Sequence, residues 1–261
     1  TISENHIAFT HAGDIWISDL SGENSKRLTS TAAVETHPHF SPDGQSIAFS
    51  SNRSGTNSVY VMPSSGGQAQ RLSWHASGGS VSGWTPDGQK VLFASNRDSA
   101  HRGIVRLWTI PIAGGPAEMV LDQWAFNGSF SGNGKHMVID RMSRWDTEWR
   151  NYRGGQNTPL VVIDLDNLQE TLIKSDSAMD IEPVWVNDTV YFLSDRDWVS
   201  NVWSYSVKRK KLKQITKFKN ADIKQLASNG SQLIFEKNGD LYTYNLATQQ
   251  HQKLSISLTG D

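Results

Sequence analysis

Short apolar runs separated by turn residues recur along the whole chain. The clearest set lies within residues 36–73, where four runs cover residues 37–40, 47–50, 58–62 and 69–72. Turn residues fill the gaps between the runs, beginning with Pro42, Asp43 and Gly44. Runs of this length bounded by such turns predict a four-stranded antiparallel meander.

The same segment occurs six times when the copies are aligned by the apolar residue that opens the second run. That residue is Ile7, Ile47, Val91, Met137, Val190 or Leu233, so the copies recur every 40 to 53 residues. Two positions later the copies carry Phe9, Phe49, Phe93, Ile139, Phe192 and Phe235. Because strand residues alternate between two faces, both positions face the same side of each predicted sheet.

A repeat of roughly 40 to 50 residues with four strands per unit is typical of a β-propeller, because one sheet cannot bury its own faces and must stack on its neighbours. The sequence therefore predicts an all-β, six-bladed β-propeller with four antiparallel strands per blade. The predicted blades cover residues 1–30, 31–73, 74–121, 122–175, 176–216 and 217–256, and residues 257–261 begin a linker. Each copy supplies four strands of its own, so we expect no shared-strand closure.

Two repeated features have structural explanations. The third run has a tryptophan in three copies, Trp16, Trp108 and Trp203, and we expect these side chains to be buried between blades. A tag of Ser, Asn or Asp, and Arg follows the second run at residues 51–53, 95–97 and 194–196. We expect the middle residue to close a turn and the arginine to bond to the backbone of a neighbouring blade. A ligand role is the alternative.

Composition narrows the class of protein and of partner. The chain has 261 residues, 37% of them hydrophobic, which is enough for the core of a single all-β domain. A net charge of -1 gives no overall attraction to nucleic acid or to an anionic membrane. No apolar run is long enough to insert as a transmembrane helix. The absence of cysteine excludes disulfides and thiol catalysis but is compatible with either redox compartment.

Catalytic, metal-binding and cofactor motifs are missing from the sequence, so we predict no catalytic, metal or cofactor site. His37 and His39 could share one face of an innermost strand and line a channel, although no third ligand has the spacing to complete a metal site with them. The basic residues at 208–211, with Lys213, are predicted to form an exposed hairpin tip that protects a sheet edge. An acidic partner for this tip is the alternative.

The repeats, with Ser-Pro-Asp-Gly followed by Ile-Ala-Phe, resemble those of TolB-type proteins and of tricorn-type proteases. An insertion at residues 141–155 distinguishes the two. Its Trp145, Trp149 and the sequence Tyr152, Arg153, Gly154, Gly155 look like an element in the fourth blade of the first propeller of tricorn proteases. Trp145, Trp149, Tyr152 and Arg153 are therefore candidate docking residues, and a well-packed structural loop is the alternative.

The resemblance implies that the parent protein is a large, self-compartmentalising serine peptidase that degrades oligopeptides. A second propeller, a PDZ-like domain and a catalytic domain would follow, and no catalytic residue would fall within this chain. This segment would be a non-catalytic channel, gating and docking module. Its partners would be other domains or subunits of the parent, itself a homo-oligomer, and oligopeptides in transit. The first residue is Thr1, so we expect any leader to have been removed; we expect a cytoplasmic location, with the periplasm also compatible.

One departure from the family limits what can be carried over. Basic residues on the connector between blades two and three are thought to help hold the carboxylate of the substrate in this family, but residues 74–84 contain only His75 as a basic side chain. Two other functions stay open. One is a stand-alone, protein-binding propeller of the TolB type, and the other is a propeller that gates an oligopeptidase with an α/β-hydrolase module. The residues that follow Asp261 would distinguish all three.

Overall fold

The computed structural model describes residues 1–101, 103–142 and 151–258. They form two compact units. The first unit contains Thr1–Trp124 together with the chain from Leu254 onward, and the second contains Ala125–Lys253.

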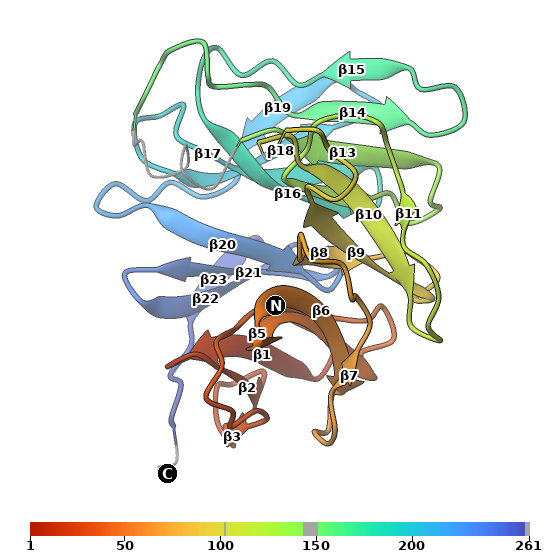
Figure 1. Cartoon of the computed structure of the whole chain (residues 1–261). Helices are drawn as coiled ribbons and strands as arrows, with labels where there is room; N and C mark the ends of the chain where they lie inside the picture. The colour runs from red at the N-terminus through yellow and green to blue at the C-terminus, as the bar shows by residue number, and fades with distance from the viewer. Residues whose placement is uncertain (102, 143–150, 259–261) are drawn as a thin grey trace. The chain divides into compact units, whose positions relative to one another are not determined.

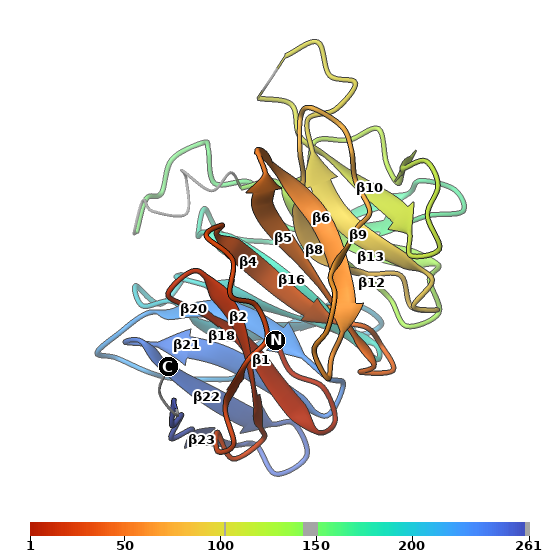
Figure 2. The ribbon, with the colours of Figure 1, turned by 60° about the horizontal axis from the view of Figure 1, so that its bottom comes forward.

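The first unit contains three antiparallel sheets, which we number as blades one to three in chain order (Figure 1). Blade one has β1 (His6–His11), β2 (Asp14–Asp19) and β3 (Lys26–Arg27). Blade two has β4 (Glu35–Phe40), β5 (Ser46–Ser54), β6 (Thr56–Pro63) and β7 (Gln70–Arg71). Blade three has β8 (Ser80–Trp84), β9 (Lys90–Ser95), β10 (Arg106–Pro111) and β11 (Glu118–Met119). Figure 2 shows β4, β5 and β6 side by side.

The second unit contains three four-stranded sheets, blades four to six. Blade four has β12 (Asn127–Phe130), β13 (His136–Asp140), β14 (Val161–Asp164) and β15 (Glu170–Leu172). Blade five has β16 (Asp180–Val186), β17 (Thr189–Ser194), β18 (Asn201–Ser206) and β19 (Lys211–Gln214). Blade six has β20 (Ile223–Ser228), β21 (Gln232–Lys237), β22 (Asp240–Asn245) and β23 (Gln250–Lys253).

The predicted fold class is confirmed: the chain is an all-β, six-bladed β-propeller built from antiparallel meanders. Blade one has three regular strands, and an antiparallel bridge between Ile2 and Ile7 supplies its fourth strand position. Every sheet of the described residues is made of strands that are consecutive in the sequence, so none takes a strand from the other end of the chain. The described residues include no helix that is long and apolar enough to cross a membrane.

Adjacent sheets within each unit pack face to face through apolar side chains. Three separate clusters illustrate this: one joins blades one and two, one joins blades four and five, and one joins blades five and six. The repeated phenylalanines Phe49, Phe93, Phe192 and Phe235 are among the largest fully buried side chains. The alternation seen in the sequence therefore identifies residues that face a neighbouring blade.

The third-run tryptophans follow the expectation only in part. Trp16 and Trp108 are buried, and Trp108 belongs to the apolar cluster between blades two and three. Trp203 is only partly buried, which corrects the prediction for the fifth copy. Its ring packs against the cluster between blades four and five and is covered by the guanidinium of Arg196, whose Cζ lies 4.8 Å from the ring centroid.

The chain that follows β23 packs against the first unit. Leu254 is buried, and the backbone N–H of Ser257 donates a hydrogen bond of 3.3 Å to the carbonyl of Gly22. Gly22 has a φ of +92°, and a Cβ atom built there would lie 2.9 Å from the carbonyl oxygen of Ser255. The turn between β2 and β3 therefore requires glycine at this position.

Candidate functional site

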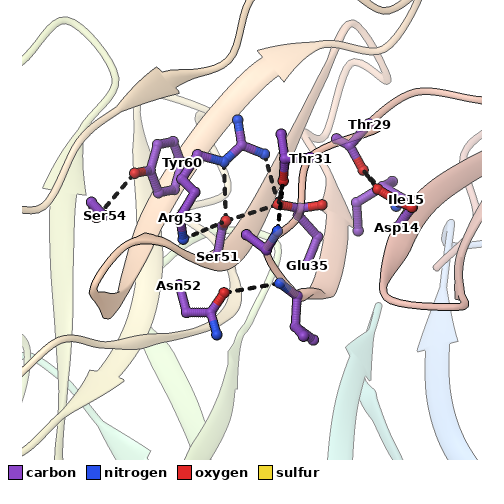
Figure 3. Close-up of polar contacts among 12 residues, drawn as sticks. Asp14, Ile15, Thr29, Thr31, Glu35, Ser51, Asn52, Arg53, Ser54 and Tyr60 are labelled. Carbon is purple, nitrogen blue, oxygen red and sulfur yellow. Dashed lines mark hydrogen bonds and ion pairs between the residues drawn. The ribbon is translucent and has the colours of Figure 1, made fainter.

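Two blades hold a fully buried acid at the start of their first strand. Glu35 in β4 and Asp180 in β16 are both 0% exposed. Arg53 donates to Oε1 of Glu35 at 2.9 Å, and the hydroxyls of Thr31 and Ser51 donate to the same oxygen at 2.9 Å (Figure 3). In blade five, Nη2 of Arg196 lies 2.9 and 2.7 Å from the two carboxylate oxygens of Asp180. Each buried negative charge is thus neutralised within its own blade.

The arginine of each tag also stacks on aromatic rings. The Cζ of Arg53 lies 4.9 Å from the ring centroid of Tyr60, and that of Arg97 lies 4.6 Å from the ring of Phe93. The expectation that the arginines bond to the backbone of a neighbouring blade holds for Arg196, which donates to the Lys174 carbonyl of blade four at 3.4 Å. The closer partners of the tag arginines lie in their own blade: aromatic rings in all three and a buried acid for Arg53 and Arg196. The repeated tag is a structural device, which agrees with the first of the two interpretations given above.

Blade three keeps the arginine and lacks the acid. Gly79 precedes β8 at the place that Glu35 and Asp180 occupy in their own blades, and a Cβ atom there would lie 2.6 Å from Cδ2 of Phe93. Arg97 is 7% exposed, and its Nη2 is buried with no hydrogen-bond partner in the described part of the chain. Burial lowers the pKa of Arg97 from its usual value. Its positive charge is therefore the least compensated of the three tag arginines.

The insertion in blade four is fixed to blade five by Arg153. Nη1 of Arg153 donates to both carboxylate oxygens of Asp195 at 2.9 Å, and Nη2 donates to the Asp195 carbonyl at 2.7 Å. The guanidinium also covers the ring of Trp198, with Cζ 4.6 Å from the centroid. Asp195 is 6% exposed and accepts from the backbone N–H of Met179 as well. A bidentate pair to such a well-held acid gives the insertion a fixed point on the neighbouring blade.

Two of the four candidate docking residues can be placed. Tyr152 and Arg153 are both half-buried, and the side chain of Asn157 bridges the Tyr152 carbonyl and the Ser177 carbonyl. Trp145 and Trp149 lie outside the described residues. The part of the insertion that the structure describes is thus anchored to blade five at Asp195 and at Ser177.

Comparison with known proteins gives the family. The model of the tricorn protease N-terminal beta propeller domain matches residues 1–250. This chain belongs to that family. Tricorn protease homolog 1 of Streptomyces coelicolor is 30% identical over 260 residues, which cover 97% of this chain and 24% of that protein. The tricorn protease of Thermoplasma acidophilum is 25% identical over 272 residues, which cover 98% of this chain and 24% of that protein. The chain spans about a quarter of the length of these relatives.

Solved structures agree on the fold. The crystal structure of the tricorn protease superposes on the whole of this tricorn-type propeller with a TM-score of 0.88 at 23% identity, using 26% of that chain. TolB from Agrobacterium tumefaciens covers 89% of this chain and 84% of its own with a TM-score of 0.71 at 15% identity. The similarity to TolB is therefore one of architecture, and the family match favours the tricorn type.

The first strands of three blades in this tricorn-type propeller contain a residue with left-handed backbone. His37, Glu182 and Gln225 have φ values of 53°, 52° and 55°, and each lies at a β-bulge where its strand loses register with its partner. Non-glycine residues seldom adopt this conformation, and bulges re-aim the side chains of a strand. The bulge between Thr36 and His39 interrupts the regular alternation on which the expectation that His37 and His39 share one face was based.

The bulged residue Glu182 links three blades of the second unit through hydrogen bonds. Its backbone N–H donates to Oδ2 of Asp140 in blade four at 3.1 Å. Its own Oε2 accepts from the N–H of Leu226 in blade six at 2.7 Å. Burial raises the pKa of Glu182, and it raises the pKa of Asp140 to about 7. The negative charges of Glu182 and Asp180 contribute to the rise at Asp140.

The two candidate histidines differ in their environments. His37 is exposed, and its Nδ1 lies 2.9 Å from Oγ1 of Thr36. The residue His39 as a whole is half-buried, but protein atoms surround its imidazole closely. The burial of the imidazole lowers the pKa of His39 to about 3. His39 is therefore a neutral imidazole at neutral pH. Within the described residues no group of three or more His, Cys, Asp or Glu side chains is placed to hold a metal ion. The channel-lining role of both histidines stays a prediction.

Sequence reasoning missed the buried acids. Glu35 and Asp180 each stand three positions before a proline, Pro38 or Pro183, in the first run of their copies. This shared spacing, together with the arginine tag of the same copy, was the available signal. Asp140 and Glu182 gave no such signal, because their carboxylates accept from backbone N–H groups, which any residue type supplies.

The contrast between Arg196 and Arg97 can be measured. Arg196→Met leaves Asp180 buried without its cation, so we expect it to lower the free energy of unfolding by about 3 to 5 kcal/mol. Arg97→Met leaves no buried acid without a cation, and it removes a poorly compensated positive charge. We therefore expect it to change the free energy of unfolding by less than about 1 kcal/mol. Urea denaturation at pH 7 measures both values. Equal losses for the two variants would contradict this account of the tag arginines.

The buried Asp140 should make stability depend on pH. Its pKa of about 7 in the folded chain lies above the ordinary carboxyl value of 3.8, so between these pH values the folded chain holds a proton that the unfolded chain has released. The resulting stability is complete below the unfolded pKa and is lost progressively as the pH rises from there to about 7, with a slope of at most about 1.4 kcal/mol per pH unit. Asp140→Asn should reduce this slope, which urea denaturation at pH 5, 6 and 7 measures. Identical slopes for both proteins would exclude Asp140 as the source.

Proposed function

We propose that this chain is the non-catalytic N-terminal propeller of a tricorn-like serine protease that degrades oligopeptides. The match to the family model over residues 1–250 supports this assignment. The share of about a quarter of the relatives' length supports the view that peptide hydrolysis belongs to other parts of a longer protein.

Within the parent protein, the propeller serves as a channel, gating and docking module. The observation that carries the docking role is the anchoring of the blade-four insertion by the bidentate contact of Arg153 with Asp195. Anchoring one end of the insertion lowers the entropic cost of binding a partner there. Trp145, Trp149 and Tyr152 are the residues that would contact other domains or subunits of a homo-oligomeric parent, and His37 and His39 would meet oligopeptides in transit.

The residues that continue past Asp261 test this assignment against a TolB-type protein. A second series of similar repeats, followed by a module with a catalytic serine and histidine, is the expected continuation. A chain that ends soon after Asp261 would favour the stand-alone propeller, and an α/β-hydrolase module would favour a gated oligopeptidase of another fold.

We expect the purified 261-residue chain to have no peptidase activity, because its sequence offers no motif with a nucleophile, a base and an oxyanion site. Fluorogenic oligopeptides provide the measurement. Turnover that copurifies with the folded chain, and that disappears when one of its own serine or histidine residues is replaced, would overturn the assignment.

The docking role predicts a separation of assembly from stability. Trp145→Ala with Trp149→Ala should leave the melting temperature of this chain within a couple of degrees while weakening assembly of the full-length protein, because docking residues stabilise the contact rather than the fold. Trp74→Ala is a matched control, since Trp74 is a tryptophan with 75% exposure on another connector. Size-exclusion chromatography and thermal melts measure the two quantities. A large melting shift would make Trp145 and Trp149 core residues.

A further inference from the structure

A cavity of about 430 Å³ lies between blades five and six, within the second unit, and is lined by residues of β17, β18, β19 and β22. One wall comes from the face of blade five, where Tyr191, Ser204 and Lys213 are cross-strand neighbours in a single row. Tyr244 of β22 and Leu246, which follows β22, form the opposite wall. The volume is in the range of sites that bind ligands.

At one packing position beside the cavity, blade five has a smaller side chain than the other blades, which have a β-branched residue there. Ser204 lies two residues after Val202, whose N–H donates to the hydroxyl of Thr216 at 2.9 Å. The same bond in blades one and two is made by the N–H groups of Ile15 and Val59, also at 2.9 Å. Two residues after these, blades one and two carry Ile17 and Val61, and both belong to apolar clusters with the next blade. A serine at this position leaves the space of the aliphatic side chain unfilled.

The chemistry of the cavity is cationic. Arg209, Lys211 and Lys213 line it, and no carboxylate is among the lining residues. Over the described ranges none of these three cations forms an ion pair. Basic residues on the outer strands of other blades do form ion pairs, as Lys253 of β23 does with Asp240 at 2.7 Å. Three uncompensated cations around one hollow attract an anionic ligand.

Two phenol groups add hydrogen-bond donors to the cavity. Tyr191 and Tyr244 lie on opposite walls, and their hydroxyls have no hydrogen-bond partner among the residues that the structure describes. Burial raises the pKa of both tyrosines, so both remain protonated at neutral pH and can donate. Their rings also offer apolar surface beside the cations.

The cavity continues into a second hollow of about 360 Å³, with which it shares Thr189, Tyr191 and Leu246. The second hollow extends to the turns at Asn187 and Gly230. The first hollow is a groove between two walls, and its residues Lys211 and Lys213 on one wall and Tyr244 and Leu246 on the other are each two positions apart, as in an extended chain. Lys211 and Lys213 are two positions apart on β19, so their side chains lie on one face about 6.5 to 7 Å apart.

We propose that this groove binds a peptide segment in an extended conformation in which acidic and apolar residues alternate. The acidic side chains pair with Lys211 and Lys213 on the blade-five wall, because alternate residues of an extended segment have the same spacing as the two lysines. The apolar side chains point to the opposite wall and pack on Tyr244 and Leu246. This binding site is separate from the channel and docking roles proposed above, and it does not depend on them.

The test is fluorescence anisotropy with a labelled peptide of sequence Glu-Leu-Glu-Leu-Glu and the whole 261-residue chain. Lys211→Glu with Lys213→Glu should weaken binding at least tenfold. Lys208→Glu with Lys210→Glu is the matched control, because these lysines belong to the same hairpin and carry the same charge change but do not line the cavity. The control should change affinity less than threefold.

A second variant tests the cavity without changing charge. Ser204→Val places an aliphatic residue there, as in blades one and two, so it should narrow the hollow between Tyr191 and Lys213, leave the melting temperature unchanged or raised, and weaken peptide binding at least tenfold. Two outcomes would show that the peptide is attracted to the surface charge alone and would overturn the proposal. One is an equal loss of peptide affinity in the Lys211/Lys213 and Lys208/Lys210 variants, and the other is unchanged binding by Ser204→Val. Absence of binding at millimolar peptide, or displacement by an equal concentration of inorganic phosphate, would overturn it as well.

Discussion

Burial of both faces of each sheet is the constraint on which the rest of this structure depends. In β5 the consecutive residues Ile47, Ala48 and Phe49 are all 0% exposed, so both faces of the strand are hidden. A single sheet cannot exclude water from both of its faces, and only stacking against neighbours achieves this. Full burial of one large apolar side chain contributes about 1.5 to 3 kcal/mol, so the repeated phenylalanines favour stacking in every blade that carries one.

The stacking explains the arginine tags. An acid at the start of a first strand is removed from water once the neighbouring sheet is in place, and an isolated buried carboxylate is strongly destabilising. Glu35 and Asp180 are therefore found with an arginine that also spreads over aromatic rings. In blade three, Phe93 lies so close to Gly79 that no side chain fits there. That blade has close aromatic packing where the other two have an acid, and its arginine is left without a carboxylate.

Sequence alone predicted the features that depend on local pattern. The repeat, the turns and the buried phenylalanines follow from the alternation of apolar residues and from turn chemistry. Together they predict the six blades. Alternation fails at His37, Glu182 and Gln225, because a bulge resets the register and nothing in the local pattern marks it. The partners of Arg153 and Glu182 lie 42 and 44 residues away in the sequence and belong to other blades, so spacing within one copy could not show them.

In a repeat protein the informative positions are those that depart from the repeat. Gly79 and Ser204 are smaller than the residues at the same positions of other copies, and residues 141–155 are an insertion in the sequence of the fourth copy. Gly79 is explained by Phe93, which fills the space, so this departure concerns structure. The hollow that Ser204 lines also has cations that pair with no acid among the residues that the structure describes. A residue that departs from the repeat without a neighbour that restores packing or charge balance is expected at a binding site, because proteins sacrifice favourable packing and charge pairing where function requires it. This criterion separates the outer groove of blade five from the repeated acid and arginine pairs, which are compensated and structural.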